Sequence, residues 1–109
     1  MPNTYTNAKK YLTGTSVTTL YTAPALTTAI VKSILVSEDS GNADTITVTI
    51  TDTAASPATF SVFKTKSISA NGTAELLTAP LVMKTGEILK VTAATANRLH
   101  VVASILEVS

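Results

Sequence analysis

Hydrophobic and polar residues alternate strictly over residues 44–52. Ile46, Val48 and Ile50 fall on one face of an extended chain, and the other face carries Thr45, Thr47, Thr49 and Thr51. A period of two residues is typical of a strand that buries one face. We therefore predict a strand here, with an aliphatic core side and a threonine side.

A longer apolar segment precedes it at residues 28–37. Ile30, Ile34 and Val36 fall on one side of this segment, and Val31 and Leu35 fall on the other. We predict a central strand that is covered on both faces. Residues 38–43 contain Asp, Ser, Gly and Asn, which favour turns. We predict that this turn joins the two strands as a hairpin.

Further strands are predicted from shorter patterns between turn residues. They cover residues 59–68, 73–78, 87–93 and 98–108, with weaker candidates at 10–15 and 17–23. Phe60 and Phe63 are assigned to the core. Short strands separated by Gly, Pro and Asn, with no helical period, indicate an all-β fold. We predict a single antiparallel β-sandwich of about eight short strands, jelly-roll-like or immunoglobulin-like.

Residues 1–10 lack a core pattern. We predict an extended N-terminal arm over this segment, followed by one β-sandwich domain over residues 11–109, since 109 residues suit a single domain. The composition agrees with a β fold, because the chain contains 21 threonines and only 14% charged residues. β-Branched side chains favour strands over helices.

Charge and cysteine content exclude several function classes. The formal net charge is +1 and there is no Cys. No broad positive field is therefore available for nucleic acid or an anionic membrane, and no thiol for disulfides, zinc or catalysis. The first residues also lack the apolar run of a secretory signal. We expect a protein made in a cytoplasm that binds neither nucleic acid nor membrane.

No catalytic motif is present in the sequence. His100 is the only imidazole, and it lies in a predicted strand between Leu99 and Val101, so we interpret it as a strand side chain rather than a base. The glycines lie singly in separate turns and form no phosphate-binding loop. We expect no enzyme activity and no cofactor.

The loop at residues 39–44 contains weak candidates for metal ligands. Asp39, Asn42 and Asp44 carry oxygen donors of the kind that Ca²⁺ prefers. Their spacing matches no EF-hand, and a turn stabilised by its own side chains explains the same residues. We therefore expect no metal, and these three residues would be the ligands if one bound.

Two further features concern the sheet surfaces. Lys64 and Lys66 alternate on one predicted strand, where they would protect a sheet edge from pairing. The threonine side has three interpretations: an exposed sheet face, an ice-binding array, which needs several aligned threonine rows, or a surface that contacts another subunit. The subunit-contact interpretation is considered because this side carries no charged residue and interface cores are depleted in charge.

Four segments resemble small virion structural proteins of tailed bacteriophages. They are residues 21–36, with a Tyr-x-x-Pro entry and an Ala-Ile-Val-Lys-Ser-Ile strand, residues 45–51, residues 86–93, with Gly-Glu-x-Leu-x-Val, and residues 98–107. The resemblance implies a non-enzymatic capsid decoration (cement) protein that binds and stabilises the head shell. Its alternative is a tail, neck or baseplate accessory protein, including one for host attachment.

The resemblance also implies the partners and the location. These are the major capsid protein or other virion subunits, a homo-oligomer with a trimer favoured, and the virion after assembly in the host cytoplasm. We place the contacts on the arm and the threonine side: Pro2, Asn3, Tyr5, Lys9, Lys10, Thr45, Thr47, Thr49 and Thr51. A small carbohydrate- or calcium-binding module is the alternative from another class, although the chain has no Trp for a sugar platform.

Overall fold

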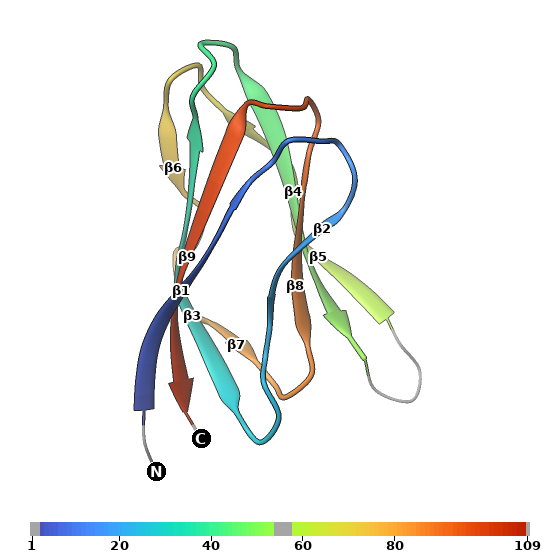
Figure 1. The fold of residues 1–109 in the computed structure, drawn as a ribbon, viewed down its shortest axis with the longest axis vertical. Coiled ribbons are helices and arrows are strands. Elements are labelled where there is room, and N and C mark those ends of the chain that lie inside the picture. Colours follow the sequence, from blue (N-terminus) through green and yellow to red (C-terminus); the bar gives the residue numbers. More distant parts are fainter. Residues whose placement is uncertain (1–2, 54–57, 109) are drawn as a thin grey trace.

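The computed structural model describes residues 3–53 and 58–108, and nine strands lie within them (Figure 1). The strands are β1 (Asn3–Tyr11), β2 (Thr18–Thr22), β3 (Thr28–Glu38), β4 (Asp44–Asp52), β5 (Ala58–Ile68), β6 (Thr73–Glu75), β7 (Leu81–Met83), β8 (Ile88–Ala93) and β9 (Leu99–Val108). In this described part, no helix is long and apolar enough to cross a bilayer. The predicted all-β fold class is confirmed.

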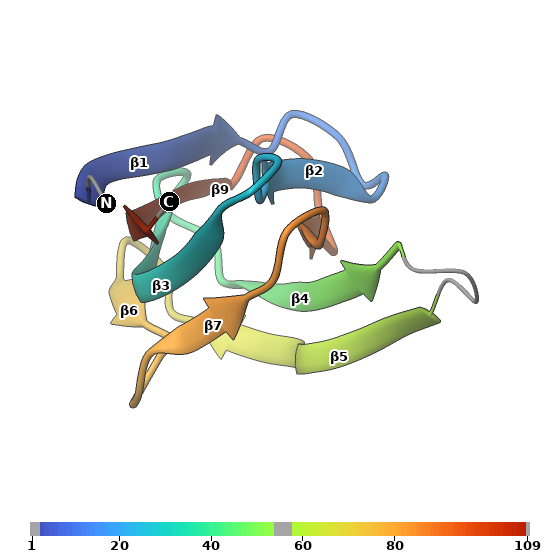
Figure 2. The ribbon, with the colours of Figure 1, turned by 90° about the horizontal axis from the view of Figure 1, so that it is seen from below.

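The strands form two antiparallel sheets (Figure 2). One has the order β1-β9-β3-β6, with β7 also paired to β3, and the other has the order β2-β8-β4-β5. If β6 and β7 are taken as one interrupted strand, the strand pairs are nested along the sequence. The first strand, β1, pairs with the last, β9; β2 pairs with β8; β3 pairs with β6 and β7; and β4 pairs with β5. This nesting is the jelly-roll order, whereas the immunoglobulin order pairs the first two strands.

Aliphatic side chains from both sheets fill the space between them. The predicted core side of β4 contributes Ile46 and Val48, which are fully buried. The alternation predicted for the last two long strands is also confirmed, because their core sides are buried: Leu89 and Val91 in β8, and Leu99, Val101, Ala103 and Ile105 in β9. One core is thus shared by the two sheets.

A polar contact also links the two sheets. Tyr21 of β2 donates a hydrogen bond of 2.5 Å to the Glu107 carboxylate of β9. Burial raises the pKa of the Tyr21 hydroxyl, and the hydrogen bond and the negative charge of Glu107 raise it further. The hydroxyl therefore stays protonated and acts as a donor.

The predicted hairpin between β3 and β4 is wrong. These strands belong to opposite sheets, and residues 39–43 cross from one sheet to the other. Alternation shows which face of a strand is buried, but it carries no information about which strand lies beside it. The turn residues serve this crossing as well as they would serve a hairpin.

Strand β3 is central, as predicted, because β9 pairs with one of its edges and β6 and β7 pair with the other. Its predicted coverage on both faces is wrong, since Leu35 on the outer face is 40% exposed. A register shift between Val31 and Ser33 allows Val31 and Ile34 both to face the core. Such a bulge breaks the strict period of two.

The N-terminal segment differs from the predicted arm. Residues 3–11 form β1, which pairs with β9 along its whole length, so the described part of this segment is an edge strand of the sandwich. Pro2 lies outside the described residues. Apart from half-buried Ala8, the side chains of β1 are exposed, which explains the missing core pattern. The predicted strand at residues 10–15 is wrong beyond Tyr11.

Strand β5 is an edge strand, as expected from Lys64 and Lys66. The core assignment is wrong for Phe60, which is 57% exposed, while Phe63 packs partly against the core. The predicted strand at 73–78 ends early, at Glu75, and β7 was not predicted. Segments of three residues contain too little pattern for the period to be recognised.

Candidate interaction surfaces

The threonine side of β4 lies on the outer face of the four-stranded sheet. Thr45, Thr47 and Thr49 are half-buried and Thr51 is buried. Their register partners are Thr59, Ser61 and Ser67 in β5, and Ile88, Lys90 and Thr92 in β8. We call these ten residues the threonine face. It is a mostly polar surface with one apolar partner, Ile88, and one charged side chain, Lys90.

Hydrogen bonds fix part of the threonine face. The hydroxyl oxygens of Thr51 and Thr59 lie 3.1 Å apart, and Thr47 Oγ1 accepts the backbone N–H of Thr65 at 3.1 Å. Register shifts on both sides of Val48 interrupt the ladder between β4 and β5. The threonine rows therefore do not continue regularly onto β5, which argues against the ice-binding interpretation.

Apolar side chains gather on the outer face of the other sheet. The register places Tyr5, Leu106, Ile30 and Val82 in one row across β1, β9, β3 and β7. Leu35 and Val102 form a second row, which Ser33 and Ser104 separate from the first and which Lys9 and Glu75 flank. We call the six apolar residues of these two rows the outer patch. Tyr5 is 75% exposed and Val82 is 56% exposed. An exposed apolar cluster of this kind is a common mark of a protein contact.

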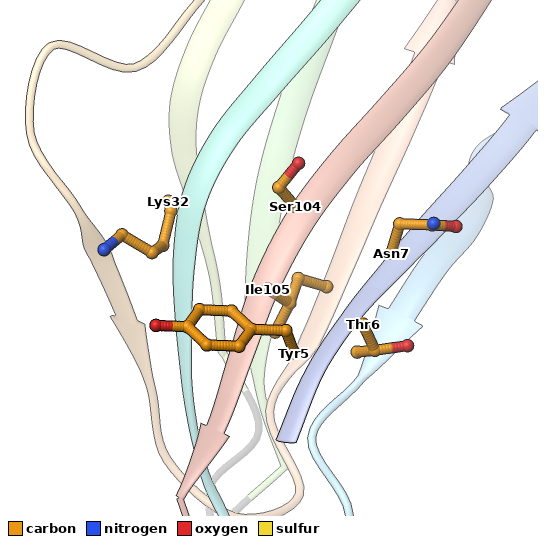
Figure 3. Close-up of a pocket in the computed structure, with 6 residues that line it drawn as sticks. All are labelled: Tyr5, Thr6, Asn7, Lys32, Ser104 and Ile105. Carbon is orange, nitrogen blue, oxygen red and sulfur yellow. The ribbon is translucent and has the colours of Figure 1, made fainter. Parts of the chain in front are cut away.

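A shallow hollow of about 350 Å³ lies at the Tyr5 end of the outer patch (Figure 3). It is lined by Tyr5, Thr6, Asn7, Lys32, Ser104 and Ile105. Figure 3 shows the Tyr5 ring lying across β9, on the same side as Lys32. The lining combines an aromatic ring, an ammonium group and hydroxyls without a carboxylate.

At the other end of β1, Tyr11 lies opposite His100 of β9, the only histidine of the chain. The rings of Tyr11 and His100 stack with centroids 4.4 Å apart and an interplanar angle of 7°, and His100 Nε2 lies 3.6 Å from the Asp39 carboxylate. A hollow of about 280 Å³ is lined by Tyr11 and His100 together with Lys9, Lys10, Val101 and Val102. His100 thus lies on a strand face, as predicted, and its contacts are with a ring and an acid.

Glu38 organises the crossing between the sheets. Its buried carboxylate accepts the backbone N–H groups of Ser40, Gly41 and Asn71 at 2.7, 2.9 and 3.0 Å, and the Ser40 hydroxyl at 2.5 Å. Burial raises the pKa of Glu38, but these hydrogen bonds outweigh it, led by that from Asn71, and lower the pKa to about 2. The carboxylate is therefore ionised and structural.

The three candidate metal ligands in this loop have separate partners. Asp39 is paired with His100, the Asn42 side chain reaches the Ser40 carbonyl at 3.4 Å, and the Asp44 carboxylate accepts the Thr95 N–H at 3.1 Å. Among the described residues, no group of three or more His, Cys, Asp or Glu side chains could hold a metal ion. The loop therefore has the features of a turn stabilised by its own side chains.

Sequence reasoning missed the outer patch and the Tyr11–His100 stack. Ile30, Leu35 and Leu106 look like core residues in the sequence, because hydrophobicity does not tell which face of a strand is covered. The sequence of β9 did indicate an apolar outer face. Val102 and Leu106 are even-numbered, whereas the core residues of this strand are odd-numbered, so the two sets point to opposite faces. No protein-family model matches the chain, and no curated protein matches it.

Proposed function

We propose that the chain is a non-enzymatic structural protein of a bacteriophage particle that decorates the capsid and stabilises its shell. The observation that carries this proposal is the outer patch, a set of apolar side chains on the outer face of the five-stranded sheet. Two further features support it: the threonine face is nearly uncharged, and the jelly roll is an architecture that viral capsid proteins share with lectins and cupins. Fold alone does not assign a role.

The outer patch and the threonine face lie on the two outer sides of the sandwich. The outer patch has no charged member and the threonine face has one, Lys90, whereas interface cores are generally depleted in charge. We propose that the outer patch contacts the major capsid protein and that the threonine face is the second contact. Two modest contacts on one subunit increase the occupancy of a repetitive shell.

The test is binding of purified protein to particles that lack it. Val82→Lys places a charge in the outer patch, and Thr49→Lys places one in the threonine face. Val17→Lys is the matched control, because Val17 is 64% exposed and outside both surfaces. We expect the first two variants to occupy fewer sites on the particle than the wild type. We expect the control to bind as well as the wild type. Equal occupancy of all four proteins would overturn the proposal.

Labelled protein on particles in electron micrographs separates the two locations. A label over the whole shell supports decoration of the capsid. A label confined to one vertex would overturn that role and indicate a tail, neck or baseplate accessory. Truncation of residues 1–10 is a poor test, because it removes most of β1 from the sheet.

A further inference from the structure

The sheet edges of this sandwich differ in how they are protected. Edges expose unpaired backbone N–H and C=O groups, which proteins shield with short strands, bulges or lysines. Strands β6 and β7 have three residues each, and β2 has five with a register shift. Strand β5 has two register shifts and the two edge lysines.

Strand β1 also carries two lysines, Lys9 and Lys10, but among the edges of the described residues it is the exception in length and regularity. It has nine residues, and its register with β9 runs without a shift from Asn3 to Tyr11. Figure 2 shows it as the outermost strand of its sheet. A long, regular edge strand of this kind is a template for a strand from another chain.

The hydrogen bonds of β1 show which residues face the free edge. Leu12 follows β1 in the same register, and its N–H donates to the Leu99 carbonyl at 2.9 Å. In an antiparallel ladder, successive residues direct their backbone groups to alternate sides. The even-numbered residues of β1 therefore bond to β9, and the free edge is formed by Asn3, Tyr5, Asn7, Lys9 and Tyr11.

We propose that two copies of the chain pair through β1, antiparallel about a two-fold axis at Asn7, and so join their five-stranded sheets into one. Asn7 is the midpoint of β1, so this register uses the whole edge of both copies. It is independent of the proposed role in a phage particle. The resemblance to phage proteins implied a trimer, and the edge geometry favours a dimer instead.

The side chains of β1 suit this register. Tyr5 of one copy lies opposite Lys9 of the other on the outer face, where an ammonium group can pack on an exposed aromatic ring. Lys10 lies opposite Thr4 on the inner face. In this register no lysine of one copy lies opposite a lysine of the other. Parallel pairing in register would instead place Lys9 beside Lys9 and Lys10 beside Lys10 of the second copy. This charge pattern selects an antiparallel second copy as the occupant.

Sedimentation velocity over a dilution series tests the pairing. We expect wild-type protein to reach twice the mass of the 11.3 kDa chain and to dissociate on dilution. Asn7→Lys places two ammonium groups opposite each other at the axis, and we expect it to remain monomeric. Asn42→Lys, in an exposed loop, makes the same charge change and should dimerise like the wild type. Equal melting of Asn7→Lys and the wild type at a dilution where both are monomeric would show that the fold is intact.

Cysteine variants test the register, because the chain has no Cys of its own. Paired residues at the axis lie about 5.5 Å apart at Cα, which permits a disulfide. We expect Asn7→Cys to form a covalent dimer on mild oxidation and Asn3→Cys, at the end of the same strand, to form none. A monomeric or trimeric wild type, a dimeric Asn7→Lys, or cross-linking at Asn3 but not Asn7 would overturn the proposal.

Discussion

Single residues hold the connections of this sandwich in place. The ionised Glu38 carboxylate accepts the backbone N–H groups of Ser40 and Gly41 in the crossing between the sheets. At the other extreme, Leu26 is 89% exposed and has a φ of 57°, in the left-handed region that L-residues with large side chains avoid. One of these residues stabilises its loop, and the other is a site of backbone strain.

Replacing Glu38 with Gln should make the thermal stability of the protein less dependent on pH. The folded-state pKa of about 2 lies below the ordinary value of 4.5, so the carboxylate stabilises the fold fully above about pH 4.5. This stabilisation is lost as the pH falls toward 2. We expect Glu38→Gln to melt well below the wild type at about pH 7 and close to it at about pH 2. An equal difference at both pH values in thermal melts would contradict this.

Leu26→Gly should stabilise the protein. The substitution relieves the positive φ and removes a side chain that buries almost nothing, so we expect a gain of about 0.5–1 kcal/mol in the free energy of unfolding. Asn97→Gly is the matched control, because Asn97 also has a positive φ, of 65°, but Asn tolerates that region. Denaturant titrations should show a smaller gain for the control. A loss for Leu26→Gly would refute the strain argument.

At the scale of elements, irregularities in the strands determine which contacts form. The bulge in β3 allows Ile34 to face the core, and its backbone groups point to the side where β6 ends at Glu75. The Glu75 carboxylate at the end of β6 accepts the Ile34 N–H at 2.8 Å, the Leu77 N–H at 3.1 Å and the Ser33 hydroxyl. Burial raises the pKa of Glu75, but these hydrogen bonds lower it overall.

Glu75→Ala should loosen the junction between β3 and β6. It leaves the N–H of buried Ile34 without this acceptor, and we expect a loss of about 1–3 kcal/mol in the free energy of unfolding. Asp39→Ala removes an exposed carboxylate that pairs only weakly with His100, and should cost less than about 0.5 kcal/mol. Urea denaturation compares the two variants. Equal losses would show that Glu75 has no special role at the bulge.

The whole molecule depends on one core shared by two sheets. Leu99 of the five-stranded sheet and Leu89 of the four-stranded sheet are both fully buried. Neither sheet covers its own apolar face, so the two should unfold together. The β1 pairing would bring two outer patches onto one continuous sheet face, which links the dimer to bivalent binding of a repetitive surface.

Leu99→Ala and Leu89→Ala should therefore have similar effects. Each removes fully buried side-chain volume, and we expect each to lower the free energy of unfolding by about 2–5 kcal/mol in a single transition. Leu35→Ala, at an outer position that is 40% exposed, should cost clearly less. Two separate transitions in calorimetry of either core variant would contradict a shared core.

How far prediction succeeds depends on the range of the interaction. Period-two patterns predicted the core sides of β4, β8 and β9, because the alternation of side chains along a strand is local geometry. The same reasoning failed for Phe60, and it missed the outer patch, because exposure depends on whether another layer covers that face. It also missed the edge at β1, whose backbone pairs with β9 across most of the chain length.

The amino-acid sequence by itself determined that this protein is all-β, which strand faces are apolar, and where the chain turns. These properties follow from side-chain preference and period within a few residues. Only the tertiary structure decided that the turn at residues 39–43 crosses between sheets, that β1 is a free edge, and that the apolar side chains of the outer patch face away from the core. The reason is that strand pairing joins residues distant in sequence, and local patterns do not encode which strands become neighbours.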